Sequence, residues 1–100
     1  MARVRKTAKI RLDYHEIFLY VAERNLSAAE KLISSFDTAA QRIAEMPGIG
    51  ARRPELGVEV RSYPVGDYLL FYRSAGKGIE LLRVIHGARN LRRQFRRNSS

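Results

Sequence analysis

Apolar residues return at intervals of three and four along the first half of the chain. Between Thr7 and Arg24 they form one face of a predicted α-helix, made of Ile10, Tyr14, Ile17, Phe18 and Val21. The hydroxyl of Thr7 suits the N-cap of this helix. A second helix is expected from the capping box Ser27–Glu30 to Pro47, because its apolar positions follow the same period. The short connection between the two predicts an antiparallel helical hairpin.

The apolar period changes to two in the second half of the chain, after the loop Pro47–Gly57, and a period of two is typical of β-strands. The middle part of this region is apolar on both faces, as a central strand would be. The turns are short, with Pro64–Asp67 in the first and Ser74–Gly78 in the second, so the strands should form an antiparallel meander. Three strands are therefore expected, over residues 58–63, 68–73 and 79–85.

The order of these elements indicates a single domain over residues 1–100. Residues 2–6 alternate small or apolar side chains with basic ones and predict a short edge strand. The fold class is therefore α+β, with the order β-α-α-β-β-β and an N-terminal helical hairpin packed on an antiparallel sheet. A short C-terminal helix over residues 88–97 is left open, and residues 98–100 are expected to fray. The sheet face away from the hairpin needs cover from the C-terminal segment, a partner or a second copy.

Charge is unevenly distributed and changes the functional picture. The chain has 19 Lys+Arg against 10 Asp+Glu, a net charge of +9, and 15 of the basic residues are arginine. Residues 1–50 hold eight basic and six acidic residues, whereas residues 51–100 hold eleven and four. Arginine presents a planar fork of donors that suits carboxylate and phosphate. A basic surface for an anionic partner is therefore favoured over a face that only aids solubility.

Thiol, metal and cofactor chemistry find little support in the sequence. There is no cysteine, which removes disulfides and thiolate nucleophiles and fits a reducing cytoplasm. The two histidines, His15 and His86, lie in different elements, and no carboxylates show ligand spacing, so neither a metal nor a cofactor is expected. No signal peptide and no membrane-length apolar window is present, so we expect a soluble cytoplasmic protein without membrane contact.

The run 79–91 carries the most unusual chemistry of the chain. It reads as an apolar strand with Arg83 in its middle, followed by His86 and Arg89. Strand pairing could bring Arg61 near this group, and such a cluster would bind phosphate and stabilise a developing negative charge. The alternative is structural, because each arginine could instead pair with a nearby carboxylate, namely Glu59, Asp67 or Glu80, or cap the C-terminus of a helix.

Two long motifs resemble those of one family of small proteins. They are Val60–Arg73 and Gly78–Leu91, and their order and separation are similar to those of the RelE/ParE superfamily of bacterial toxins. The Ala28-Ala29 pair at the start of the second helix and Met46–Gly48 after it fit the same pattern. The resemblance therefore covers nearly the whole chain, and it is closest to the ParE branch, also called plasmid stabilisation proteins.

This resemblance implies the toxin of a type II toxin–antitoxin system, neutralised by an antitoxin that is encoded beside it and wraps it with a helix and an extended segment. RelE-type members enter the ribosomal A site and cleave mRNA, whereas ParE-type members inhibit DNA gyrase and are not nucleases. Arg61 and Arg89 match two arginines of the RelE type, and Arg52-Arg53 is the candidate for a basic pair before the sheet. The tyrosine that transfers a proton corresponds to Phe95, so only His86 remains as an acid or base.

The leading expectation is a ParE-like inhibitor of DNA gyrase with no catalytic residues. Contacts to the target are expected from Arg89, Arg92, Arg93, Arg96 and Arg97, and contacts to the antitoxin from Arg61, Tyr63, Tyr72 and Arg83. The first alternative is a metal-independent, ribosome-dependent mRNA endoribonuclease that uses Arg61, Arg83, His86 and Arg89. The second is a non-catalytic basic module that binds nucleic acid. The implied partners are the antitoxin, in a hetero-oligomer, and either gyrase or the ribosome with mRNA.

Overall fold

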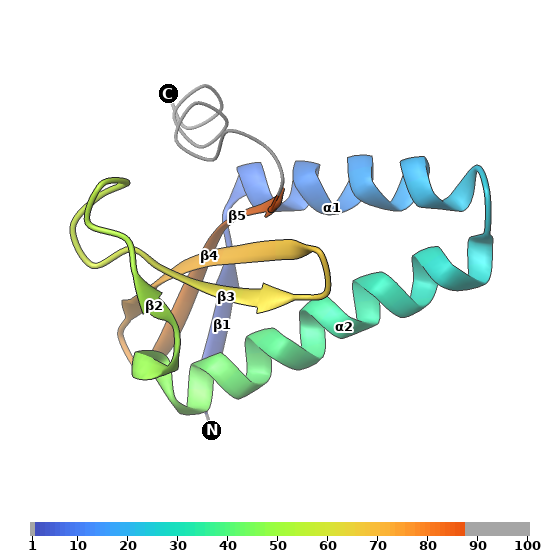
Figure 1. The fold of residues 1–100 in the computed structure, drawn as a ribbon. Helices are drawn as coiled ribbons and strands as arrows, with labels where there is room; N and C mark the ends of the chain where they lie inside the picture. Colours follow the sequence, from blue (N-terminus) through green and yellow to red (C-terminus); the bar gives the residue numbers. More distant parts are fainter. Residues whose placement is uncertain (1, 88–100) are drawn as a thin grey trace.

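Two helices and a five-stranded sheet make up residues 2–87, the part of the chain described by the computed structural model (Figure 1). The elements are β1 (Arg3–Lys6), α1 (Ala8–Ala22), α2 (Leu26–Glu45), the 3₁₀ turn η1 (Pro47–Ile49), β2 (Ala51–Arg52), β3 (Arg61–Val65), β4 (Tyr68–Ala75) and β5 (Gly78–His86). The α+β class and the helical hairpin are confirmed. The short strand β2, inside the expected loop, is an addition.

The sheet has the strand order β1-β5-β4-β3-β2, and it is mixed rather than antiparallel throughout. Strands β3, β4 and β5 form the expected antiparallel meander, and β2 joins β3 in the same sense. Strand β1 lies at the edge, as predicted, but it runs parallel to β5, and the two helices and three other strands lie between them in the chain. Gly78 permits this pairing, since a Cβ there would collide with the backbone of Arg3.

The helices cover one face of the sheet and leave the other to a second apolar cluster. Helix α1 contacts β5, and α2 contacts β1, β3 and β5. The core on this side is built around Ile10, Phe36, Ile43, Leu70, Tyr72 and Leu81. On the opposite side a smaller cluster contains Val60, Phe71 and Ile85. Within residues 2–87, no helix is both long enough and apolar enough to cross a membrane.

The two helix starts illustrate where the cap prediction succeeds and where it fails. Thr7 caps α1 as expected, because its hydroxyl accepts a hydrogen bond from the Ile10 backbone N–H at 3.2 Å. Helix α2 is capped by Asn25 rather than Ser27, since the Asn25 side-chain oxygen accepts from the Ala28 N–H at 3.0 Å. Asparagine and serine are about equally favourable at an N-cap. The helix therefore begins directly after Asn25, the earlier of the two residues, and is longer than a start at Ser27 would make it.

The first strand of the meander starts later than the sequence indicates. Val58 is 88% exposed in the preceding loop, and Glu59 adopts a positive φ of 64°, which is incompatible with a strand. Strand β3 therefore begins at Arg61 and extends through Pro64 to Val65, into the expected turn. Pro64 is tolerated because β2 pairs only with the first two residues of β3, so the missing N–H faces no strand.

Candidate functional site

The most unusual feature of the sequence, Arg83 in an apolar strand, is explained by a buried ion pair. Its guanidinium donates from Nε to Asp13 Oδ2 at 2.6 Å and from Nη2 to Asp13 Oδ1 at 2.9 Å. Both residues are nearly inaccessible, with Arg83 4% and Asp13 7% exposed. The expected structural partners of Arg83 are therefore wrong, and Glu80 instead pairs with Arg73 at 2.8 Å.

Asp13 also completes the backbone hydrogen bonding of β5. Strand β1 ends at Lys6, so the outer edge of β5 loses its strand partner beyond Leu81. Thr7 continues the pairing with two bonds at 3.2 Å, from its N–H to the Leu81 carbonyl and from its hydroxyl to the Leu82 carbonyl. The Val84 N–H then donates to Asp13 Oδ2 at 3.1 Å. The Asp13–Arg83 ion pair thus links α1 to β5, and its contacts stabilise the fold.

The candidate cluster of Arg61, Arg83 and His86 does not converge. Arg61 lies opposite Tyr72 on the face that the helices cover, whereas Arg83 lies opposite Phe71 on the other face. His86 shares the helix face with Arg61, but it pairs with Tyr68, at the far end of β4 from Tyr72. That separation is four residues along the strand, about 13 Å at the usual rise. The ring of His86 packs edge-on against Tyr68, 5.3 Å between centroids.

Two of the expected antitoxin contacts, Arg83 and Tyr72, are buried. The Tyr72 side chain has no exposed surface, and its hydroxyl accepts from the Gly50 N–H and donates to the Pro47 carbonyl, both at 2.8 Å. Burial raises the pKa of Tyr72 above its ordinary value, against the smaller opposing effects of Gly50 and the Arg61 charge. Tyr72 therefore anchors the segment between α2 and β2, and neither buried side chain is available on the surface.

Of the remaining expected contacts, Tyr63 and Arg61 reach the surface of the described fold. Tyr63 is half-buried and lines a shallow groove between α2 and β3, together with Thr38 and Arg42. Arg61 is also half-buried and is discussed below. The expected target contacts lie outside the described residues, as does Phe95; they are Arg89, Arg92, Arg93, Arg96 and Arg97.

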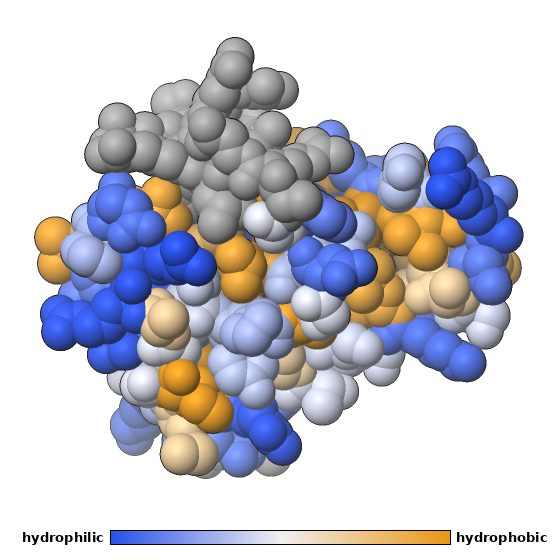
Figure 2. All heavy atoms as spheres, viewed as in Figure 1, coloured by the Kyte–Doolittle hydropathy of each residue, from blue (hydrophilic) through white to orange (hydrophobic). Residues whose placement is uncertain are grey.

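A cationic cavity, which the sequence did not predict as a unit, lies where β2 meets β3. Its volume is about 360 Å³, and we call it the arginine pocket, defined by Arg52, Arg53 and Arg61. Figure 2 shows hydrophilic side chains gathered over β2 and the loop that follows, at the left of the view. Apolar wall residues are Pro47, Pro54, Val58 and Val60. The adjacent Arg52-Arg53 pair was a signal for this site, but its cross-strand partner could not be read from the sequence.

The three guanidinium groups of the arginine pocket are held to different degrees. Arg53 donates from Nε to Ser62 Oγ at 2.8 Å and lies 3.6 Å from Glu55. Arg61 donates from Nη1 to the carbonyls of Gly50 and Gly48 at 2.9 and 3.4 Å. The Arg52 side chain is exposed and makes no hydrogen bond or ion pair within residues 2–87. The pocket can therefore attract an anion, and the same residue range contains no group of metal-ligating side chains.

Comparison with known proteins places this geometry in a family. The family model described as the ParE toxin of the type II toxin–antitoxin system parDE matches residues 4–91. Toxin ParE3 of Caulobacter vibrioides is 27% identical over 96 residues, covering 95% of this chain and 96% of its own length. Toxin ParE1 of the same organism is 28% identical over 93 residues, covering 92% and 96%. Among solved structures, a chromosomal ParDE system from P. aeruginosa has a similar fold, with a TM-score of 0.70, 24% identity, and coverage of 86% of this chain and 96% of that chain.

Proposed function

Because the chain belongs to the ParE toxin family of type II toxin–antitoxin systems, with an antitoxin as its partner, we propose that it inhibits DNA gyrase by direct protein contact. Binding of the cognate antitoxin in the cytoplasm relieves this inhibition. The observation that carries the proposal is the separation of the candidate catalytic residues. Arg61 and Arg83 lie on opposite faces of the sheet, and His86 lies four residues along β4 from the position of Arg61, so the three do not surround one phosphate.

The chemistry of RNA cleavage explains why this separation matters. A phosphoryl transition state is stabilised by donors that converge within hydrogen-bond distance of its oxygens, beside an acid or base that moves the proton. Arg83 instead gives two of its donors to Asp13. His86 packs against Tyr68 on the face away from Arg83. These contacts support inhibition through a binding surface rather than through catalysis.

One observation keeps the ribonuclease alternative open to test. Arg61 and Arg52 leave the same face of the sheet and line the arginine pocket with Arg53, and guanidinium groups there would attract an RNA phosphate. Primer extension on translated mRNA addresses this function directly. Cuts at the ribosomal A site in the presence of the toxin, lost in an Arg61→Gln variant, would favour cleavage over gyrase inhibition.

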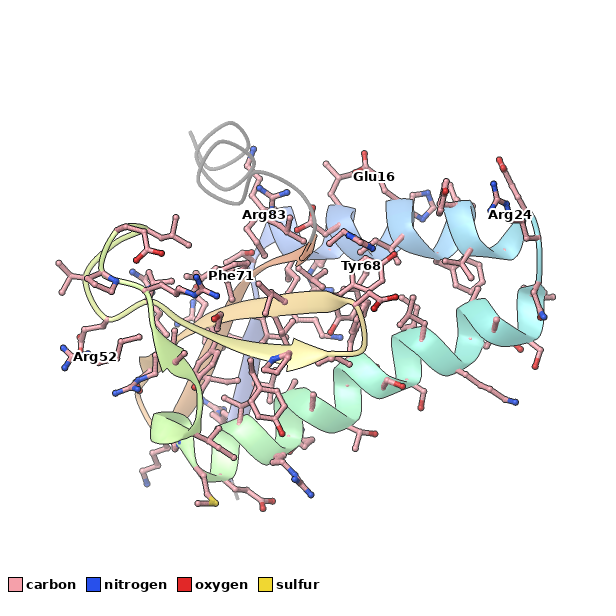
Figure 3. All side chains as sticks on the ribbon, in the orientation of Figure 1. Glu16, Arg24, Arg52, Tyr68, Phe71 and Arg83 are labelled. Atoms are coloured by element: carbon pink, nitrogen blue, oxygen red, sulfur yellow. The ribbon has the colours of Figure 1, made fainter. Side chains whose placement is uncertain are left out.

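The proposed contact surface for gyrase is the arginine-rich segment 89–97, in which five of nine residues are arginine. Such a density of planar donors favours acidic surfaces and increases the association rate at low salt. A supercoiling assay with purified gyrase tests this role. The variant Arg92→Glu with Arg93→Glu should inhibit about tenfold less strongly than wild type, since two favourable charges become repulsive. Arg24→Glu, at the far end of the helical hairpin in Figure 3, should inhibit as wild type. Equal inhibition by all three proteins would contradict the assignment of this segment.

A further inference from the structure

The arginine pocket contains a cross-strand pair of like charges. Arg52 on β2 lies directly opposite Arg61 on β3, so both side chains leave the same face of the sheet. Cβ atoms at such positions are about 5 Å apart, and like charges placed there destabilise the sheet. Within residues 2–87, neither arginine has a carboxylate within 4 Å. The repulsion is therefore not compensated by an ion pair within the described fold.

The structure holds this pair in place through the segment before β2. Gly50 lies close to the Tyr72 hydroxyl, and a Cβ added at Gly50 would lie 2.5 Å from the hydroxyl oxygen. The Tyr72 hydroxyl accepts from the Gly50 N–H at 2.8 Å, and Arg61 Nη1 donates to the Gly50 carbonyl at 2.9 Å. These contacts fix the register of β2, which places Arg52 opposite Arg61. They occupy only Nη1 of Arg61, so its other donors have no partner within residues 2–87.

We propose that the arginine pocket receives the carboxylate of an acidic side chain of the cognate antitoxin. A carboxylate has two oxygens that can accept from two guanidinium groups at once, so it would bridge Arg52 and Arg61 and cancel their repulsion. The apolar walls, Pro47, Pro54 and Val58, suit the aliphatic part of an acidic side chain and its neighbours. The proposal rests on the role of the chain as a toxin with an antitoxin, and not on the identity of its target.

The lining of the pocket favours an acidic peptide over RNA. Single-stranded nucleic acid is bound by aromatic side chains on which the bases stack, and none lines this pocket. Glu59 lines the pocket and Glu55 stands 3.6 Å from Arg53, so the rim already carries negative charge. That charge tolerates one carboxylate but repels a chain of phosphates. The net charge of +9 favours an anionic partner of either kind, so the lining of the pocket decides between them.

The first test measures the affinity of the full chain for the antitoxin expressed from the neighbouring reading frame. Arg52→Gln removes one of the two bridging groups, and affinity should fall about 10- to 100-fold, as expected for the loss of hydrogen bonds to a charged group. Arg24→Gln removes the same charge at the opposite end of the molecule in Figure 3 and should bind as wild type. The melting temperature of Arg52→Gln should be equal to or above that of wild type, because the like-charge pair is gone. An unchanged affinity for the antitoxin would overturn the proposal.

The second test identifies what enters the pocket, using the arginine Nε–H signals in nitrogen-15 NMR spectra of the toxin. A short peptide with two glutamates should shift the signals of Arg52 and Arg61, and the same peptide with glutamines should not. Prior addition of the antitoxin should abolish the shift. Tighter binding of a trinucleotide RNA, or an equal peptide shift with the antitoxin bound, would overturn the proposal. Failure of gyrase inhibition by the wild-type toxin would leave these outcomes unaffected, so the two proposals fail separately.

Discussion

Removal of the Asp13 carboxylate is the sharpest test of how the fold is fastened together. In an Asp13→Ala variant, Arg83 keeps its charge at a position that is 4% exposed, and the Val84 N–H loses its acceptor. Breaking a buried ion pair from one side costs about 3–5 kcal/mol. With a urea dependence of roughly 2 kcal/mol/M, the unfolding midpoint should fall by about 2 M. A domain of this size has about 5–15 kcal/mol of stability in total, so the variant would be severely weakened.

The matched control is Asp37→Ala, which removes a carboxylate from the other helix. Asp37 pairs with Lys6 at 3.3 Å, but its side chain is 52% exposed, so the loss should be below about 1 kcal/mol. The double variant Asp13→Leu with Arg83→Met should be more stable than Asp13→Ala, because no buried charge is left alone. Urea unfolding followed by circular dichroism measures all three proteins. Equal losses for Asp13→Ala and Asp37→Ala would show that the buried Asp13–Arg83 pair contributes no more to stability than an exposed ion pair.

Three further predictions concern single residues of the fold. Tyr72→Phe should destabilise the protein by about 1–3 kcal/mol, because the buried Gly50 N–H loses its acceptor, and hydrogen exchange at Gly50 should accelerate. Burial and the negative charge of Asp37 raise the pKa of Tyr14, so the folded state retains a proton that the unfolded chain releases near pH 10. The free energy of unfolding should therefore fall as the pH rises above 10. It should fall less in Tyr14→Phe, as alkaline denaturation curves would show. Gly78→Ala should lower the melting temperature sharply, because the added Cβ would collide with the backbone of Arg3. Gly48→Ala should leave the melting temperature unchanged, because nothing lies within 4 Å of its added Cβ. Similar melting temperatures for the two variants would contradict this account of the β1–β5 pairing.

Local patterns predicted most of the fold, and pairing between distant segments accounts for what they missed. The helices follow from apolar positions such as Ile10 and Ile17, and Thr7 marks the first cap. The parallel pairing of β1 with β5 depends on segments at the two ends of the described fold, which no local period reports. Strand β2 has only two residues and exists because it pairs with β3, so its own sequence carries no strand signal.

The candidate site was predicted in part, for a related reason. The sequence alone marks Arg83 as unusual, but the partner of Arg83 lies 70 residues earlier in the chain. A signal was present, because Asp13 occupies the apolar face of the first helix, three residues after Ile10 and four before Ile17. Two opposite charges that both lie among apolar residues are best explained if they pair with each other. A comparison of Asp13 with Arg83 would therefore have predicted this ion pair from the sequence. The opposition of Arg52 and Arg61 depends on strand register and required the structure.

We propose that this ParE-family toxin acts on DNA gyrase and that its antitoxin relieves this inhibition. The most direct measurement is supercoiling of relaxed plasmid by purified gyrase, with the full chain added and then titrated with its cognate antitoxin. We predict that supercoiling stops at saturating toxin and recovers fully at one equivalent of antitoxin. Normal supercoiling at saturating toxin would show that gyrase is not the target.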